Sequence, residues 1–124
     1  MFQKVMIANR GEIAVRIARA LQEMGITSLA VYAQDDADAM HVSAADEAVA
    51  LEASGPPAYL DGSRLLQIAL AHGCDALHPG YGFLSENADF ARACAQANIR
   101  FIGPTPEQLA LLGDKARARA LALQ

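Results

Sequence analysis

The sequence predicts an α/β domain built on a doubly wound parallel sheet of about five strands, with helices on both faces. Two observations lead to this fold class. Short apolar runs recur along the chain, and stretches with helical spacing of apolar residues separate them. The 124 residues, 53% of them hydrophobic, are enough for one domain with its own core.

The five expected strands are short enough to be buried in the middle of a sheet. They are residues 4–8, 27–32, 47–51, 75–78 and 99–102. If their order in the sheet is 3-2-1-4-5, the first and fourth strands are neighbours whose crossovers lie on opposite faces. Their carboxyl ends then open the crevice in which such folds bind ligands.

Helices are expected over residues 12–24, 63–72 and 88–97, with a short helical turn within 36–46. Gly25 occupies the position of a left-handed C-terminal cap. At the other ends, Asp61 or Ser63 is expected to cap the second helix. Ser85 is expected to cap the third, with Glu86 in its first turn.

Two further helix starts are expected near the end of the sequence. Thr105, Pro106 and Gln108 combine a cap, a first-turn proline and a capping box, which predicts a short helix. Asp114 can cap one more helix, from Lys115 onward. A lysine in the first turn opposes the helix dipole, unless an anion such as phosphate lies between it and the free amides.

Turns follow the first and fourth expected strands, and the strand order would bring them together. The first reads NRGE at residues 9–12, and the second reads HPGYG at residues 78–82. Gly80 and Gly82 allow a sharp turn that holds Tyr81 at its tip. We expect Arg10 and Glu86 to meet there and to stiffen the rim of a pocket.

Several classes of function are disfavoured by what the sequence contains. Asp35 or Asp36, after the second strand, would suit the ribose of a nicotinamide cofactor in a Rossmann-like unit. However, only Gly11 lies between Ala8 and Ala18, so the glycine-rich fingerprint is missing. A net charge of −4 without a basic cluster argues against nucleic acid, and no apolar run is long enough to span a membrane.

The residues that commonly bind metals have ordinary structural explanations. Cys74 and Cys94 lack the C-x-x-C spacing and suit reduced, packed thiols. His41 has no partner at metal spacing, so a structural hydrogen bond is expected for it. No metal ligand is therefore assigned within the chain.

Three motifs resemble those of the biotin carboxylase family. They are IANRGEIA at residues 7–14, HPGYGFLSEN at residues 78–87 and LGDK at residues 112–115. The resemblance implies the N-terminal, pre-ATP-grasp domain of an enzyme that carboxylates biotin with ATP, bicarbonate and Mg²⁺ or Mn²⁺. It implies domain bounds of 1–113, with 114–124 starting the helix that leads to an ATP-grasp domain absent from this chain.

The resemblance also implies roles for particular residues. Lys115 corresponds to a lysine that contacts the nucleotide phosphates, and Tyr81 and Gly82 correspond to the wall of the biotin pocket. The motifs at residues 7–14 and 78–87, together with the strand order, assign a group of residues to the pocket rim: Arg10, Gly11, His78, Gly80 and Glu86. No residue here is assigned the catalytic base, so the chain alone is expected to be inactive.

The exposed face of the first helix has two interpretations. Glu12 can pair with Arg16, and Arg19 with Glu23, as a solvated stripe. The resemblance implies instead that Arg16, Arg19 and Glu23 lie at the interface of a homodimer.

The other expected partners are the ATP-grasp and C-terminal domains of the same chain, a biotin carboxyl carrier domain and a carboxyltransferase. The expected location is the cytoplasm. Two alternatives stay open: the matching domain of another ATP-grasp ligase, such as a carbamoyl phosphate or purine-pathway synthetase, and a dimerisation module without catalysis. The final carboxyl acceptor, whether an acyl-CoA, pyruvate or urea, is not indicated.

Overall fold

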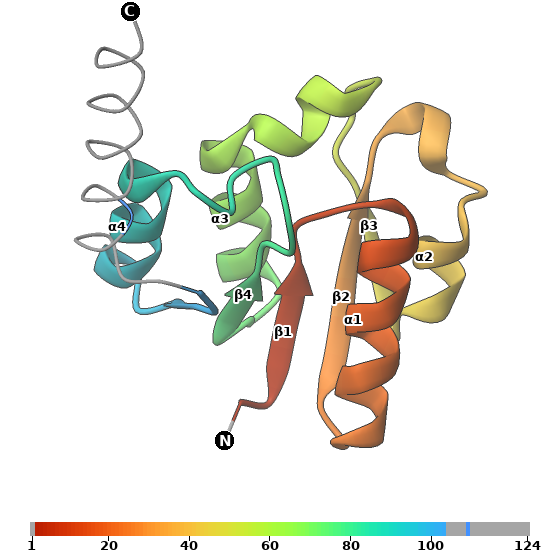
Figure 1. The fold of residues 1–124 in the computed structure, drawn as a ribbon, viewed down its shortest axis with the longest axis horizontal. Coiled ribbons are helices and arrows are strands. Elements are labelled where there is room, and N and C mark those ends of the chain that lie inside the picture. Colours follow the sequence, from red (N-terminus) through yellow and green to blue (C-terminus); the bar gives the residue numbers. More distant parts are fainter. Residues whose placement is uncertain (1, 104–108, 110–124) are drawn as a thin grey trace, which may run out of the picture.

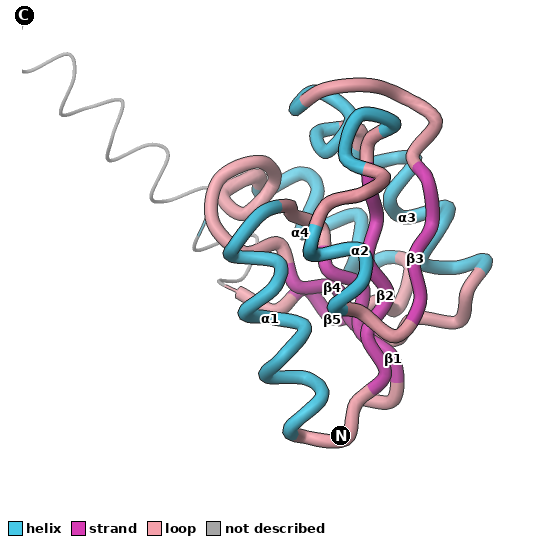
Figure 2. The backbone as a smooth tube through the Cα atoms, turned by 90° about the vertical axis from the view of Figure 1, so that its right-hand side faces the viewer, coloured by secondary structure: helices cyan, strands magenta, loops and turns pink. Residues whose placement is uncertain are grey.

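Three layers make up the fold, with a five-stranded sheet between two layers of helices (Figures 1 and 2). The computed structural model describes residues 2–103 and 109. All strand pairs are parallel, and the order is β3-β2-β1-β4-β5. The predicted fold class is therefore confirmed, and the strand order is the one for which a crevice at the carboxyl ends of the first and fourth strands is expected.

The strands and α-helices lie within a few residues of the predicted ranges, whereas a 3-10 helix at Pro56–Leu60 was not predicted. In chain order the elements are β1 (Lys4–Ile7), α1 (Gly11–Glu23), β2 (Thr27–Tyr32), the 3-10 helix η1 (Gln34–Asp36), α2 (Met40–Ala44), β3 (Glu47–Ala50), the 3-10 helix η2 (Pro56–Leu60), α3 (Gly62–Ala71), β4 (Ala76–His78), α4 (Ala88–Gln96) and β5 (Arg100–Phe101).

Alternation along β1 divides the core into two parts. Val5 and Ile7 point to the face covered by α1 and α2, whereas Met6 and Ala8 point to the face covered by α3 and α4. All four side chains are at most 1% exposed. Burial on both faces explains why β1 reads as an apolar run rather than an alternating one.

The ends of the helices confirm two of the three caps that were predicted within the described residues. Gly25 follows α1 with a φ of +73°, and the Asp61 side chain accepts a hydrogen bond from the Arg64 amide at 3.1 Å. The prediction for Ser85 was wrong, because Asn87 caps α4 by accepting from the Phe90 amide at 2.9 Å. The Ser85 amide donates to the Gly82 carbonyl at 2.9 Å, so Ser85 and Glu86 belong to the preceding turn.

The two cysteines and His41 are packed inside the domain, as the sequence predicted. Cys74 and Cys94 are free and buried, and burial raises the pKa of each thiol to about 11. The ring of His41 is 1% exposed, and its Nε2 lies 3.1 Å from the Val31 carbonyl oxygen.

Residues 2–103 and 109 contain neither a metal-binding cluster nor a membrane-spanning helix. No group of three His, Cys, Asp or Glu residues there could hold a metal ion. Likewise, no helix in this part of the chain is long and apolar enough to cross a membrane. The predicted helix starts at Thr105 and Asp114, together with Lys115, lie outside the described residues.

Candidate functional site

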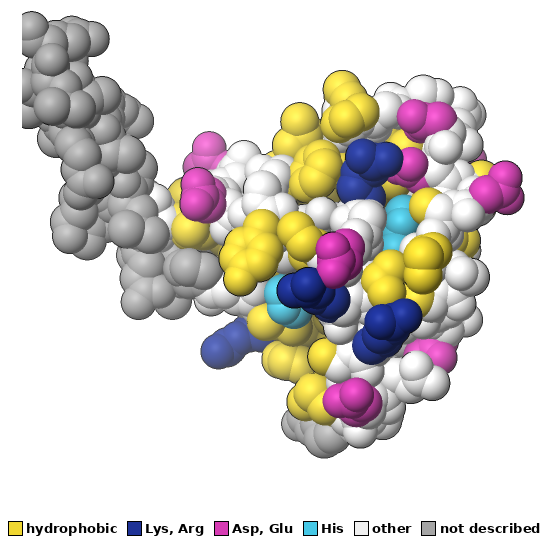
Figure 3. All heavy atoms as spheres, turned by 45° about the vertical axis from the view of Figure 1, so that its right-hand side comes forward, with side chains coloured by type: hydrophobic (Ala, Val, Ile, Leu, Met, Phe, Trp, Pro, Cys, Tyr) yellow, Lys and Arg dark blue, Asp and Glu magenta, His cyan; other side chains and the backbone are white. Residues whose placement is uncertain are grey.

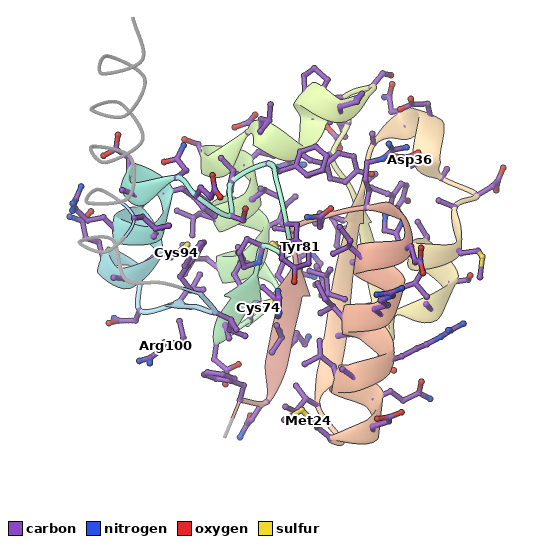
Figure 4. The ribbon with its side chains drawn as sticks, viewed as in Figure 1. Met24, Asp36, Cys74, Tyr81, Cys94 and Arg100 are labelled. Atoms are coloured by element: carbon purple, nitrogen blue, oxygen red, sulfur yellow. The ribbon has the colours of Figure 1, made fainter. Side chains whose placement is uncertain are left out.

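The turns after β1 and β4 lie side by side at the carboxyl edge of the sheet. Ile7 pairs with His78 at the ends of the two strands, and the Ala8 amide donates to the His78 carbonyl at 2.9 Å. Tyr81 lies on the loop after β4, beside the end of β1 (Figure 4). The predicted meeting of the two turns is therefore confirmed.

Asn9 joins the two turns directly. Its side chain is 2% exposed, and its Nδ2 donates to the carbonyl oxygens of Pro79 and Tyr81, each at 2.7 Å. Its Oδ1 accepts from the Arg10 amide at 2.8 Å. The sequence marked Asn9 only as the start of a turn, because nothing local indicates a contact with residues about 70 positions away.

The loop after β4 exposes an aromatic ring on an unusual backbone. Tyr81 is 78% exposed. Gly80 and Gly82, on either side of it, have φ values of +65° and +68°, which suit glycine. Phe83 has a φ of +48°, which side chains rarely adopt, and its ring lies 5.5 Å from that of Tyr59. The arrangement holds the Tyr81 ring out into solvent.

His78 supports the same loop from the end of β4. Its Nδ1 accepts a hydrogen bond from the Gly80 amide at 3.1 Å. Burial lowers the pKa of this imidazole, which favours the neutral ring that such an acceptor requires.

Arg10 pairs with Asp36 and not with Glu86, so that prediction was wrong. Its Nε and Nη2 donate to the two carboxylate oxygens of Asp36 at 2.8 and 2.7 Å. Glu86 is exposed and makes no hydrogen bond or ion pair within residues 2–103. The physical reason is that η1 brings Asp36 to the end of β2, beside the turn after β1, where a bidentate pair forms (Figure 4).

Tyr59 completes this network from η2. Its hydroxyl donates to Asp36 Oδ2 at 2.7 Å and accepts from the Ala33 amide at 3.0 Å. The Arg10 guanidinium lies 6.0 Å from the centre of the Tyr59 ring. Burial, with the nearby Asp36 carboxylate, raises the pKa of Tyr59 to about 12. In the sequence, Asp36 stood out only as a candidate ribose ligand, and no local pattern indicated its contacts with Arg10 and Tyr59.

The hydrogen bonds to Asp36 predict a pH dependence of stability. The hydrogen bond from Arg10, and then that from Tyr59, lowers the pKa of Asp36 below its ordinary value of 3.8. A lowered folded-state pKa stabilises the fold above the unfolded-state pKa, and this contribution is lost as the pH falls through the folded-state value. We therefore expect the difference in unfolding free energy between wild type and Asp36→Asn to be constant from about pH 7 to 5 and to shrink below about pH 4. Urea unfolding across this range measures it, and an undiminished difference at about pH 2.5 would contradict the assignment.

The outer face of α1 carries part of the predicted charged stripe. Arg16 Nη2 lies 2.8 Å from Glu12 Oε1, and both side chains are about three-quarters exposed. An Arg19–Glu23 ion pair is absent from the part of the chain that the structure describes. Acidic and basic side chains both occur on the face seen in Figure 3. Arg19 borders an open depression of about 440 Å³ between α1 and α2.

The fold and the site define a class of protein: an α/β domain that presents an aromatic loop at the carboxyl edge of its sheet, where doubly wound folds bind ligands. Residues 1–109 match the family described as "Biotin carboxylase, N-terminal domain". The chain belongs to this family.

Known proteins of high similarity agree with the family. The chain is 53% identical over 119 residues to a biotin carboxylase of Nostoc, and the aligned region covers 95% of this chain and 27% of that relative. It superposes on the biotin carboxylase domain of a single-chain bacterial carboxylase with a TM-score of 0.90 and 62% identity, covering 98% of this chain and 28% of that one.

A third comparison comes from a complex with bound ligands. The chain superposes with a TM-score of 0.91 and 48% identity on the biotin carboxylase domain dimer of Hydrogenobacter thermophilus 2-oxoglutarate carboxylase, in complex with MgADP, ADP and bicarbonate. The match covers 95% of this chain and 26% of that one. The chain spans only about a tenth of the pyruvate carboxylases and about a quarter of the biotin carboxylases that it matches.

Proposed function

We propose that this domain forms one wall of a biotin carboxylase site, in which ATP and bicarbonate are used to carboxylate biotin. The proposal is supported above all by the exposed loop at Tyr81 and Gly82, which hydrogen bonds from Asn9 hold beside the end of β1. An exposed aromatic ring offers a flat apolar surface with a polar hydroxyl at its edge, which suits the small polar ring system of biotin. Arg10, Gly11, His78, Gly80 and Glu86 would form the surroundings of this surface.

ATP and the metal ion would be bound by residues that lie outside the described part of this chain or in another domain. Lys115 is proposed to contact the nucleotide phosphates, and Mg²⁺ or Mn²⁺ would be held by residues of an ATP-grasp domain. The complex of the Hydrogenobacter relative with MgADP and bicarbonate supports ATP chemistry for the family. When bound, the nucleotide supplies the phosphoryl group that activates bicarbonate; this chain contributes the biotin-facing surface.

The proposal includes a domain arrangement. Residues 1–113 would form the N-terminal domain, and residues 114–124 would begin the connection to an ATP-grasp domain and a C-terminal domain. Arg16, Arg19 and Glu23 would contribute to a homodimer interface, which the dimeric Hydrogenobacter relative supports. A biotin carboxyl carrier domain and a carboxyltransferase would complete the enzyme, and the cytoplasmic location stays a prediction. Family membership favours this interpretation over the other ATP-grasp ligases.

Two activity measurements test the proposal. A complete carboxylase that carries this chain at its N-terminus is expected to hydrolyse ATP in a bicarbonate-dependent manner and to transfer labelled bicarbonate carbon to free biotin. The purified 124-residue chain is expected to do neither, because the relatives are carboxylases, a class of ligase, of which it matches only a part. A folded complete enzyme that does not carboxylate biotin would refute the proposed activity. Turnover by the 124-residue chain would refute its expected inactivity.

A further inference from the structure

The position of the Tyr81 ring depends on backbone atoms that point inward. The carbonyl oxygens of Pro79 and Tyr81 both point toward the side chain of Asn9, while the Tyr81 ring points outward. Three residues of the loop, Gly80, Gly82 and Phe83, have positive φ. A loop with this backbone keeps one shape only if the surrounding contacts hold it there.

Asn9 has the donor and acceptor set that these contacts require. An asparagine side chain offers two N–H donors and one carbonyl acceptor on a short stem, and all three of these groups make hydrogen bonds here. Aspartate of the same shape has no donor, and serine has one. Glutamine is one methylene longer, and the space toward Gly80 is closed, since a Cβ on Gly80 would lie 2.7 Å from Asn9 Nδ2.

A second anchor holds the far end of the loop and is linked to the first. Phe83 packs against Tyr59, whose hydroxyl donates to Asp36. Asp36 in turn binds the side chain of Arg10, and the Arg10 amide donates to Asn9. The two ends of the loop are therefore tied to one continuous network at the carboxyl ends of β1 and β2.

We infer that Asn9 is a positioning residue for the biotin-facing loop: its amide sets the shape of residues 79–83 and so presents Tyr81 and Gly82 to the biotin ring. This inference rests on the proposed function for the identity of the ligand. Asn9 touches no reacting atom in it. Its contribution is preorganisation, which lowers the cost of ordering the loop when biotin binds.

Hydrogen exchange tests the structural half of the inference in the 124-residue chain. Asn9→Ala is expected to speed exchange in the segment 79–87 by about tenfold, because two carbonyls lose their donors and the local opening energy falls. Ser28→Ala is the matched control. Ser28 is also 2% exposed and is hydrogen-bonded to Asp46, but it lies at the start of β2, where the amino ends of the strands face away from the loop at Tyr81. The control is expected to leave segment 79–87 unchanged.

Kinetics test the functional half in a complete carboxylase that carries this chain. Asn9→Ala is expected to raise the KM for free biotin by about tenfold, the cost of about two ordinary hydrogen bonds. The KM for ATP and the bicarbonate-dependent ATP hydrolysis without biotin should match those of the Ser28→Ala control. A merely structural role for Asn9 would move all of these together. Asn9→Ser, with one donor, is expected to fall between wild type and Asn9→Ala, and it carries the test if Asn9→Ala does not fold.

The outcomes separate the inference from the proposed function. Unchanged exchange in segment 79–87 overturns the positioning role. Faster exchange with an unchanged biotin KM in an active enzyme overturns the link to biotin. A folded wild-type enzyme that never carboxylates biotin overturns the proposed function, while the exchange result would stand or fall by itself.

Discussion

Gly80→Ala is expected to lower the free energy of unfolding by about 2–5 kcal/mol, the sum of left-handed backbone strain and overpacking. A Cβ at this position would lie 2.7 Å from Asn9 Nδ2 and 2.9 Å from Ile13 Cγ2. Asn9 cannot easily move away, because it is buried and held by three hydrogen bonds. Denaturation in urea, followed by circular dichroism, measures the change.

Gly82→Ala provides the control for the backbone term. Gly82 has nearly the same φ, +68° against +65°, but a Cβ there would meet no atom within 4 Å. We expect it to cost only about 1–2 kcal/mol. Equal losses for the two variants would show that the contact with Asn9 and Ile13 does not constrain the loop.

Asp36→Asn is expected to lower the free energy of unfolding by about 2–3 kcal/mol at pH 7. The carboxylate receives two hydrogen bonds from Arg10 and one from Tyr59, and its side chain is 10% exposed. The change leaves Arg10 half-buried without its anion, although the 41% exposure of Arg10 lets water recover part of the loss.

The exposed ion pair of α1 offers a matched control for Asp36→Asn. Glu12→Gln also replaces a carboxylate by an amide opposite an arginine, at a similar distance of 2.8 Å, but both side chains are about three-quarters exposed. Its effect is expected to stay below about 0.5 kcal/mol. Thermal unfolding of both variants in parallel measures the contrast, and a comparable loss for Glu12→Gln would mean that burial does not set the strength of the Arg10–Asp36 pair.

The sequence was sufficient to predict the strands and the α-helices of the described residues, because these depend on local patterns. Apolar runs such as residues 4–8 and 27–32 predict buried strands whichever neighbours they acquire. The order 3-2-1-4-5 is one of two common doubly wound arrangements, and the sequence alone does not choose between them. The error at Ser85 came from a competition that the sequence does not resolve: a serine can cap a helix or take part in a turn, and the glycine turn at residues 80–82 extended the loop to Asn87.

The candidate site was predicted in outline but not in its side-chain contacts. The two turns met as predicted, because strand order alone decides that. Arg10 had acidic candidates at Asp36 and at Glu86, and the choice depended on η1, a single helical turn without a strong signal. Asn9 and Tyr59 act over separations of 70 and 23 residues, where only the folded backbone decides which polar atoms meet.

The structure of a complete carboxylase carrying this chain, crystallised with biotin, ADP and bicarbonate, would show where the biotin ring binds. We expect the ring to contact the Tyr81 side chain and the backbone at Gly82, with Asn9 still bound to the carbonyls of Pro79 and Tyr81. A biotin ring bound elsewhere, with Tyr81 left in solvent, would contradict it.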